Sequence, residues 1–338
     1  MRARATYSVT VALAAILLAS AVWAFPPEKS YDPRPLSAEA EKKLTTDKFS
    51  FVVFGDTKNS KHFPGVVKLA DSLAPTFALT TGDMVKSGHA SLYDDLERTA
   101  GPFMRKYPTW PCVGNHELAT AEGWGMYKAF HGITAWDYSF DFRNARFIQI
   151  GAPNVWEKPN KMKWLEEQLA EGKKAGRHLF IWQHQPLYSV GQKRPREVPG
   201  QPNDFTRLCD KYGVIAVFAG HEHTYYRTFR DNVSYITQAL AGAQIYYLNR
   251  RGEAVDGDVY YGARGKEFGD TMLVRNGVEK IYAKPQFMVT QIFIDGAKIS
   301  GKTLAVGGEV MDEFTLLPRP TTRPSTRPAT QPKTDPGS

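Results

Sequence analysis

Metal-binding side chains recur directly after short apolar runs, and this placement limits the fold more than any other feature of the sequence. Five such motifs are spread over most of the chain: Gly55-Asp56, Gly82-Asp83, Gly114-Asn115-His116-Glu117, His184 and Gly220-His221-Glu222-His223. Each follows a stretch rich in β-branched or aromatic residues, which is typical of a buried strand. Open α/β sheets bind their ligands in the loops that follow the strands. Five motifs in this position together predict one shared metal centre.

Strand-like and helix-like stretches alternate between the motifs. The short apolar runs predict buried strands, at 51–54, 77–79, 147–150, 179–182 and 214–218. Between the third and the fourth run, Met162, Leu165 and Leu169 recur at helical spacing. A hairpin is expected across Arg143-Asn144, and later strands are expected to close a second sheet, at 234–240, 287–294 and 298–304. This alternation predicts a layered α/β fold.

The ends of the chain differ from its centre. Arg2 and Arg4 precede an uncharged run that closes on Val22-Trp23-Ala24, which predicts a signal peptide over 1–24 and export to the periplasm or the cell exterior. The run is short for an uncleaved membrane anchor, and no other segment reaches membrane-spanning length. We expect a polar, proline-containing leader at 25–48, a folded domain at 49–317, and a disordered tail rich in Pro, Thr and Arg at 318–338. Within the domain, 249–285 is expected to be an insertion or a long loop.

Charge and cysteine content exclude two classes of protein. Much of the net charge of +8 comes from Arg2, Arg4 and the basic tail. No basic patch is interleaved with aromatic residues, so no specific nucleic-acid binding is expected. The two cysteines, Cys112 and Cys209, are too few for a disulfide framework and predict buried free thiols.

The motifs in this order resemble those of calcineurin-like metallophosphoesterases and, in part, those of purple acid phosphatases. The resemblance runs from about Phe51 to Arg227. The segment 82–88 has the family's Gly-Asp-x4-Gly form, and 221–227 is similar to the purple phosphatase stretch in which Tyr and Arg follow paired histidines. The resemblance implies a four-layer αββα sandwich of two mixed β-sheets flanked by helices.

The resemblance also implies a set of metal ligands. Asp83 would bridge two divalent ions, one completed by Asn115, His184 and His221, and the other served by Asp56 and His223. Two close ions lower the pKa of a bound water and stabilise the charge on a reacting phosphate. Mixed oxygen and nitrogen ligands suit Mn, Fe and Zn alike, so the metal is not identified. Taken singly, each histidine could equally be structural, and their coincidence in family order favours the centre.

Three further positions are candidates for contact with a substrate. His116 resembles the family's general acid, which gives a proton to the departing alkoxide, and Glu117 is its expected orienting partner. Tyr226 and Arg227 are expected to flank the substrate, although an aromatic and an arginine after a motif equally fit packing.

One position departs from the family pattern. The first motif of the family is Asp-x-His, and this chain has Lys58 two residues after Asp56. The tyrosine that purple phosphatases carry three residues after the second Asp is also replaced, by Lys86. Three interpretations are open: a weakened two-ion centre in which Lys58 contacts phosphate, a one-ion centre in which its charge partly replaces an ion, and a site without catalysis. The complete second ligand set favours catalysis, and we prefer the weakened two-ion centre.

The sequence therefore predicts an exported phosphoesterase that hydrolyses a phosphomonoester or phosphodiester by attack of metal-activated water. Its cofactors would be one or two divalent ions, and its substrate a small-molecule or lipid phosphoester. The alternatives are a phosphodiesterase or nuclease of the cell envelope, and a non-catalytic protein that binds a phosphate ligand. The sequence does not indicate an oligomeric state.

Overall fold

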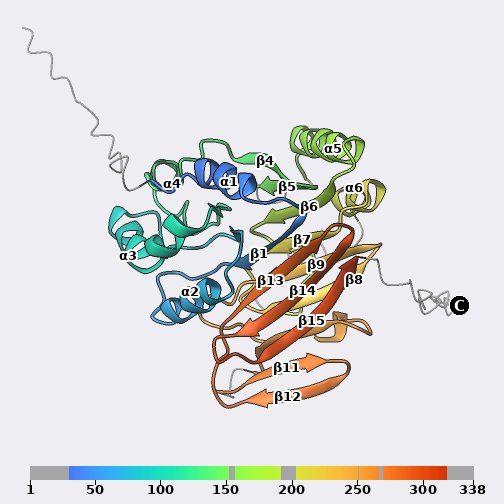
Figure 1. Ribbon diagram of the computed structural model, residues 1–338. Coiled ribbons are helices and arrows are strands. Elements are labelled where there is room, and N and C mark those ends of the chain that lie inside the picture. The colour runs from blue at the N-terminus through green and yellow to red at the C-terminus, as the bar shows by residue number, and fades with distance from the viewer. Residues whose placement is uncertain (1–29, 152–156, 192–202, 250, 266–268, 318–338) are drawn as a thin grey trace, which may run out of the picture.

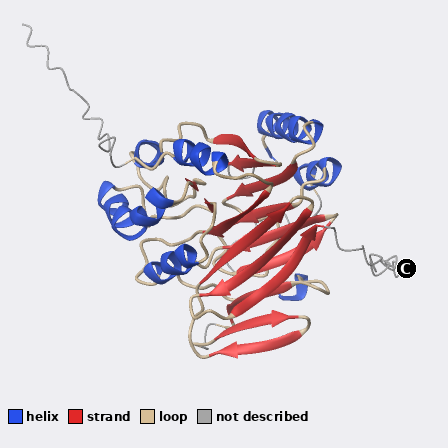
Figure 2. Cartoon of the chain, viewed as in Figure 1, coloured by secondary structure: helices blue, strands red, loops and turns tan. Residues whose placement is uncertain are grey.

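Two mixed β-sheets pack face to face and carry helices on both outer surfaces (Figure 1). The computed structural model describes residues 30–151, 157–191, 203–249, 251–265 and 269–317. Figure 2 shows the strands gathered in the centre and the helices at the periphery. The predicted α/β class and the four-layer αββα sandwich are therefore confirmed.

The six-stranded sheet has the order β15-β14-β13-β1-β2-β3. Strands β1, β2 and β3 run parallel to one another. Strand β13 pairs with β1, β14 with β13 and β15 with β14, each in antiparallel orientation. The bounds are β1 (Lys48–Phe54), β2 (Phe77–Thr80), β3 (Thr109–Trp110), β13 (Met288–Asp295), β14 (Lys298–Ala305) and β15 (Val310–Leu317). The carboxyl ends of β1, β2 and β3 consequently meet at one edge of the sheet.

The nine-stranded sheet has the order β12-β11-β10-β8-β9-β7-β6-β5-β4. Strands β5, β6, β7 and β9 run parallel at its centre. The bounds are β4 (Asp137–Phe142), β5 (Ala145–Ile150), β6 (His178–Gln183), β7 (Ala216–Ala219), β8 (Tyr225–Arg230), β9 (Val233–Gln238), β10 (Val259–Ala263), β11 (Thr271–Arg275) and β12 (Val278–Tyr282). The hairpin across Arg143-Asn144 is confirmed as β4 and β5.

Two predictions about the C-terminal half were wrong in part. The segment 249–285 is not one long loop, because it contains a short 3-10 helix (Arg251–Glu253) and strands β10, β11 and β12, which extend the nine-stranded sheet. The three later strands do not close a single sheet: β9 lies in the nine-stranded sheet, whereas β13 and β14 lie in the six-stranded one. Strand β12 is exposed over four of its five residues and carries Glu279 and Lys280, so it lacks the apolar run that predicts a buried strand.

The helices surround the two sheets, and most of them contribute apolar residues to a core cluster. They are α1 (Pro33–Lys42), α2 (Phe63–Ser72), α3 (Ala90–Lys106), α4 (Gly123–His131), α5 (Pro159–Lys174) and α6 (Asp204–Tyr212). Apolar residues of α2, α3 and α4 form one core cluster with the outward side chains of β1 and β2, such as Val52 and Phe54. Leu165 and Leu169 of α5 and Phe205 of α6 cover the outer face of the nine-stranded sheet.

An aromatic layer fills the space between the two sheets. Phe51 of β1 stacks on Phe77 of β2 at 5.2 Å and meets the edges of Phe147 and Phe180, from the opposite sheet, at 5.2 and 5.7 Å. Successive residues of a strand point to opposite faces, so Phe51 and Val53 enter this layer while Val52 faces the helices. Offset and edge contacts of this kind stabilise a core beyond the area that they bury.

The folded part begins earlier than the predicted residue 49. Within the leader 25–48, Tyr31 is buried against Phe130 at 4.9 Å, and Asp32 caps α1 by accepting a hydrogen bond from Arg34 N at 3.0 Å. The predicted signal peptide and the tail 318–338 lie outside the described residues.

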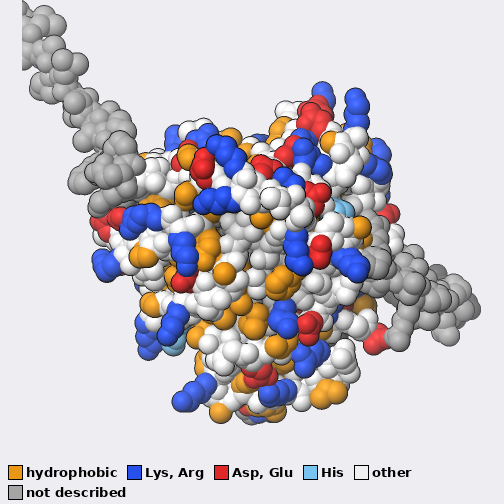
Figure 3. Space-filling model, viewed as in Figure 1, with side chains coloured by type: hydrophobic (Ala, Val, Ile, Leu, Met, Phe, Trp, Pro, Cys, Tyr) orange, Lys and Arg blue, Asp and Glu red, His pale blue; other side chains and the backbone are white. Residues whose placement is uncertain are grey.

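The described surface is mixed in charge. Basic and acidic side chains are interspersed on the face seen in Figure 3. In the described part of the chain, no helix combines the length and the apolar character that crossing a membrane requires. Cys112 and Cys209 are buried free thiols, as predicted.

Candidate metal centre

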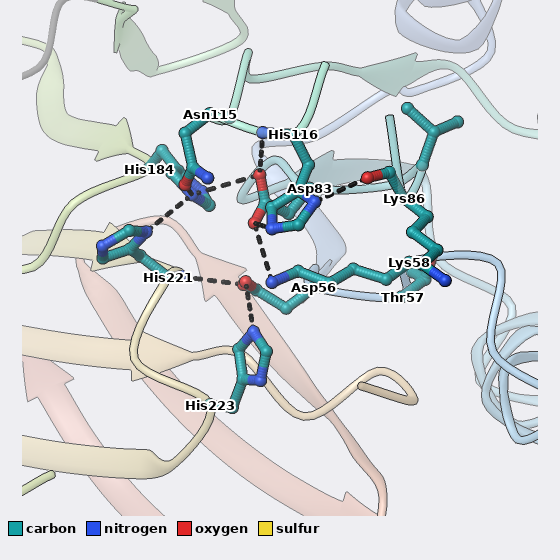
Figure 4. Close-up of polar contacts among 12 residues, drawn as sticks. Asp56, Thr57, Lys58, Asp83, Lys86, Asn115, His116, His184, His221 and His223 are labelled. Atoms are coloured by element: carbon teal, nitrogen blue, oxygen red, sulfur yellow. Dashed lines mark hydrogen bonds and ion pairs between the residues drawn. The ribbon is translucent and has the colours of Figure 1, made fainter. Parts of the chain in front are cut away.

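The strand-end loops of both sheets converge on one point (Figure 4). The six-stranded sheet supplies the loops after β1, β2 and β3, and the nine-stranded sheet supplies the loops after β6 and β7. These loops bring together all six residues predicted as metal ligands: Asp56, Asp83, Asn115, His184, His221 and His223. The general rule that open α/β sheets bind ligands at the carboxyl ends of their strands accounts for the location.

Backbone conformation turns three of these side chains inward. Asp56, Asp83 and His221 have φ values of 57°, 53° and 69°, in the left-handed region that non-glycine residues seldom occupy. Such strain persists only where the surrounding structure enforces it, and it is concentrated at functional sites. The neighbouring loops approach closely: a Cβ on Gly114 would lie 2.2 Å from Asp83 Oδ1, and one on Gly220 would lie 2.5 Å from Asp56 Oδ2. Both positions therefore require glycine.

We call Asp83, Asn115, His184 and His221 the second metal site. His184 Nε2 lies 3.0 Å from Asn115 Oδ1, 3.0 Å from His221 Nδ1 and 3.3 Å from Asp83 Oδ1. Ligand atoms bound at about 2.0–2.1 Å to one ion are separated by roughly 3.0–3.4 Å. The nitrogen and oxygen atoms of this site thus have the spacing of a coordination shell.

A carbonyl group fixes the tautomer of His184. Its Nδ1 lies 2.8 Å from Thr81 O, and because a carbonyl can only accept, Nδ1 carries the proton. Nε2 is therefore the nitrogen that would bind a cation, and it lies beside Asn115 and Asp83. This is the usual arrangement of metal-binding histidines, whose other nitrogen donates to a carbonyl or a carboxylate.

We call Asp56, Asp83 and His223 the first metal site. Asp56 Oδ1, Asp83 Oδ2 and His223 Nε2 are all buried and have no hydrogen-bond partner among the described residues. His223 Nδ1 donates to Gln244 O at 2.6 Å, which directs the lone pair of Nε2 at Asp56 Oδ1, 3.3 Å away. A lone pair facing a carboxylate is repulsive unless a metal cation or a proton lies between them. These three atoms, which lack hydrogen bonds, therefore have the chemistry and the spacing to hold a divalent ion.

The charges of the centre keep its shared carboxylate ionised. Burial raises the pKa of Asp83, but His184, Lys58 and His116 face it and together hold the pKa well below its ordinary value. Burial also lowers the pKa of His184, yet the Asp83 carboxylate outweighs burial and raises this pKa to about 9. Asp83 directs Oδ1 toward the second metal site and Oδ2 toward the first. It is therefore an anion placed to contact two cations.

The position of His116 matches a proton donor, but its orienting partner is not the one predicted. His116 Nδ1 donates to Lys86 O at 2.6 Å, and Nε2 faces the centre 3.8 Å from Asp83 Oδ2. The side chain is 30% exposed, so Nε2 is accessible to a substrate. Lys86 is held in turn by Asn59, whose Oδ1 accepts from Lys86 N at 2.9 Å.

Glu117 supports the loops instead of orienting His116. Its buried carboxylate accepts hydrogen bonds from the backbone N–H groups of Asp83, Met84 and Gly114 at 2.9, 2.6 and 2.7 Å. Burial and the charge of Asp83 raise the pKa of Glu117 to about 7, while the histidine and backbone donors oppose this rise. Glu117 therefore ties the second motif to the third.

The structure does not bring Tyr226 and Arg227 to the centre as predicted substrate contacts. Tyr226 OH donates to the buried Asp258 at 2.8 Å, and Arg227 forms a two-pronged ion pair with the buried Asp312 at 2.6 and 3.1 Å. Both polar groups are thus occupied by interactions that join strands. The packing alternative, and not the substrate-binding one, describes these two residues.

Lys58 lies beside the first metal site. Its Nζ is 3.2 Å from Asp83 Oδ2, and its side chain is only 17% exposed. The backbone holds it there, since Lys58 has φ of 47° and its N–H donates to Asp83 O at 3.1 Å. Figure 4 shows the side chain extending into the centre between Asp56 and Asp83.

Several residues that shape the centre were missed by the sequence-based predictions. Thr81, Lys86 and Gln244 act through backbone carbonyl groups, which leave no mark in a side-chain pattern. Tyr246 stacks on the His223 ring at 4.0 Å. The segment around Tyr246 lacks a recognisable motif, so only the folded structure reveals this contact.

Comparison with known families agrees with this geometry. The calcineurin-like phosphoesterase family model matches residues 49–225, slightly more than half of the chain. The chain belongs to the calcineurin-like phosphoesterase family. The matched region of this calcineurin-like chain contains all six predicted ligands and His116.

Individual relatives are distant. Purple acid phosphatase 23 of Arabidopsis thaliana is 26% identical over 173 residues, which are 46% of this chain and 37% of the plant protein. Serine/threonine-protein phosphatase CPPED1 of Bos taurus is 24% identical over 196 residues, which are 51% of this chain and 60% of the bovine protein. The chain spans less than two thirds of the length of either relative.

Solved structures share the fold. The structure of GAP50, the anchor in the inner membrane complex of Plasmodium, aligns with a TM-score of 0.58 at 16% sequence identity. The alignment covers 80% of this chain and 89% of the GAP50 chain. At this level of identity the similarity concerns the fold alone.

Proposed function

We propose that this protein is an exported, metal-dependent phosphoesterase that hydrolyses a phosphomonoester or a phosphodiester. The observation that carries the proposal is the convergence of six candidate ligand side chains from five strand-end loops. Three buried polar atoms at the first metal site also lack a hydrogen bond among the described residues. Family membership and the similarity to phosphatases over about half of the chain support the same reaction class.

The candidate ligands form two sets that share Asp83. Asp83, Asn115, His184 and His221 would hold one divalent ion, and Asp56, Asp83 and His223 would hold another. Divalent ions bound there would supply positive charge to the phosphoryl oxygens and activate water for attack. The second metal site has four protein ligands and the first has three, so the two are unequal.

The other residues position and protonate the substrate. His116 Nε2 is exposed toward the centre and would donate a proton to the leaving oxygen, because Nδ1 is fixed by the carbonyl of Lys86. Glu117 would hold the loops of Asp83 and Asn115 in fixed positions relative to each other, because it accepts hydrogen bonds from the backbone of both. The modified first motif, with Lys58 in place of histidine, adds a positive charge beside Asp83.

The test combines metal analysis with two assays. The purified protein would be analysed by elemental mass spectrometry and assayed with p-nitrophenyl phosphate and bis(p-nitrophenyl) phosphate, with Mn, Fe, Zn and Co supplied in turn. Turnover of one ester, abolished by a chelator and restored by metal, is the expected result. A folded, metal-loaded protein that hydrolyses neither ester would indicate a phosphate-binding protein without catalysis.

Export belongs to the proposal and has its own test. The charged start and the apolar run of residues 1–24 motivate it. Expression of the full chain in a bacterial host, followed by fractionation and N-terminal sequencing, should give a periplasmic or secreted product that begins at Phe25. A full-length product that remains in the cytoplasm would contradict export without affecting the phosphoesterase assignment.

A further inference from the structure

Lys58 and the first metal site share one ligand atom. The Nζ of Lys58 forms an ion pair at 3.2 Å with Asp83 Oδ2, which is one of the three ligand atoms of that site without a hydrogen bond among the described residues. Asp83 Oδ1, by contrast, faces His184 in the second metal site. The lysine therefore acts on one side of the centre and leaves the ligand atoms of the other side uncovered.

Three observations make the first metal site the weaker of the two. It offers three protein ligands where the second offers four. A protonated amine cannot coordinate, so Lys58 adds no ligand, and it repels a divalent ion at close range. The repulsion is poorly screened, because the Lys58 side chain is 17% exposed and the Asp83 side chain 1%.

The site is nevertheless built for an ion. Asp56 Oδ1 and His223 Nε2 are buried, unpaired within the described residues, and 3.3 Å apart. Among the described residues, Lys58 forms an ion pair with Asp83 and none with Asp56. Its ammonium group therefore does not replace an ion that would contact all three atoms. The two cations would therefore compete at Asp83 Oδ2.

We propose that Lys58 competes with the ion of the first metal site for Asp83 Oδ2, so that this ion binds weakly and exchanges while the ion of the second site is retained. An oxyanion such as phosphate relieves the competition by drawing the Lys58 ammonium group into a charge-assisted hydrogen bond. The inference rests on the proposed function, because both require the centre to bind divalent ions. It assigns to Lys58 control over when the two-ion form assembles.

The experiment measures Mn²⁺ binding and not activity. Equilibrium dialysis with elemental analysis would give the number of ions bound per chain against free Mn²⁺, without and with orthophosphate. Wild type should retain one ion per chain through gel filtration and take up a second only in excess Mn²⁺. Lys58→Met and Lys58→Gln should bind the second ion at least about tenfold more tightly when phosphate is absent.

Control variants locate the effect. Lys61→Met removes an exposed lysine three residues further along the same loop and should bind Mn²⁺ like wild type. Asp56→Asn combined with Lys58→Met should lose the gain, because Asp56 is a ligand of the first site alone. Phosphate should increase the affinity for the second ion more in wild type than in Lys58→Met. Use of both Met and Gln guards against one variant that folds poorly.

The outcomes separate the two proposals. Two ions of equal affinity in wild type, or Lys58 variants that bind the second ion no more tightly, would overturn the competition and leave the phosphoesterase proposal intact. A folded wild-type chain that binds no Mn²⁺, Zn²⁺ or Fe²⁺ would overturn both. An electron paramagnetic resonance spectrum of bound manganese gives independent support for the competition. At equal Mn²⁺, the spectrum should change from that of an isolated ion in wild type to that of a coupled pair in Lys58→Met.

Discussion

His116 Nδ1 donates a hydrogen bond to the backbone carbonyl of Lys86 at 2.6 Å, and this contact directs Nε2 into the metal centre. The nitrogen that faces a substrate is therefore set by the backbone of the Gly82–Gly88 loop and not by an acidic side chain. General acid catalysis by a positioned group contributes about 10²–10⁴ to a rate.

His116→Ala should thus slow hydrolysis of alkyl phosphates by about 10²–10⁴, because their alkoxide leaving groups need a proton. p-Nitrophenyl phosphate, whose leaving group is a weak base, should lose far less. Steady-state kcat/KM for both ester types, at equal metal content, gives the comparison. Equal losses for the two esters would argue against proton donation.

Asp83→Ala should abolish stable metal binding, because Asp83 contributes one oxygen to each metal site. Elemental analysis after gel filtration should find less than one tenth of the wild-type metal, an effect of about 1.4 kcal/mol or more. His89→Ala is the matched control: His89 precedes α3, is exposed and pairs with Glu122 at 2.9 Å. Metal retained by Asp83→Ala at the wild-type level would contradict the assigned centre.

Glu117→Gln should destabilise the chain even when metal is removed by a chelator. The amide presents an NH₂ group to a pocket of backbone donors that now share one carboxylate, so at least one buried N–H loses its acceptor. An unsatisfied buried donor costs about 1–3 kcal/mol. Urea unfolding followed by circular dichroism measures the change, and Glu122→Gln, at an exposed position, should change stability little. Similar stabilities for the two variants would rule out the loop-tying role.

His131 should make the fold sensitive to acid. Burial lowers the pKa of His131 to about 3, and its Nδ1 has no hydrogen-bond partner among the described residues. The unfolded chain takes up the proton near pH 6.5 and the folded chain only near pH 3, so stability falls as the pH falls across this interval. His131→Phe, which keeps the contacts with Tyr127 and Phe130, removes this dependence.

Between pH 7 and pH 5, wild type should lose roughly 2 kcal/mol more unfolding free energy than His131→Phe. Urea titrations at both values, in the presence of a chelator, isolate this contribution from metal binding. Parallel losses in the two proteins would show that His131 is already protonated or accessible in the folded state.

Much of the centre could be predicted from the sequence, because most of the candidate ligands lie within a few residues of the end of an apolar strand. The position of Asp56 after β1, of Asp83 after β2 and of His184 after β6 follows from strand pattern and motif order alone. Neighbouring parallel strands end at the same edge of a sheet, so their following loops are expected to meet there. This expectation does not require knowledge of how the core side chains pack.

Other features depend on long-range contacts that the sequence does not display. The role of Glu117 was mistaken because its partners are backbone N–H groups of another loop. Tyr226 and Arg227 follow the paired histidines, yet Asp258 and Asp312, distant in sequence, determine where their polar groups lie. Within 249–285, strand β12 is exposed and carries the adjacent charges of Glu279 and Lys280, so it lacks the apolar run that marks a strand in the sequence.

The second metal site takes Asp83 and Asn115 from loops of the six-stranded sheet, and His184 and His221 from loops of the nine-stranded sheet. An ion held there would be a noncovalent cross-link between the two sheets of the sandwich. Metal loading would then add to the stability of the whole fold, besides supplying the chemistry proposed for this site.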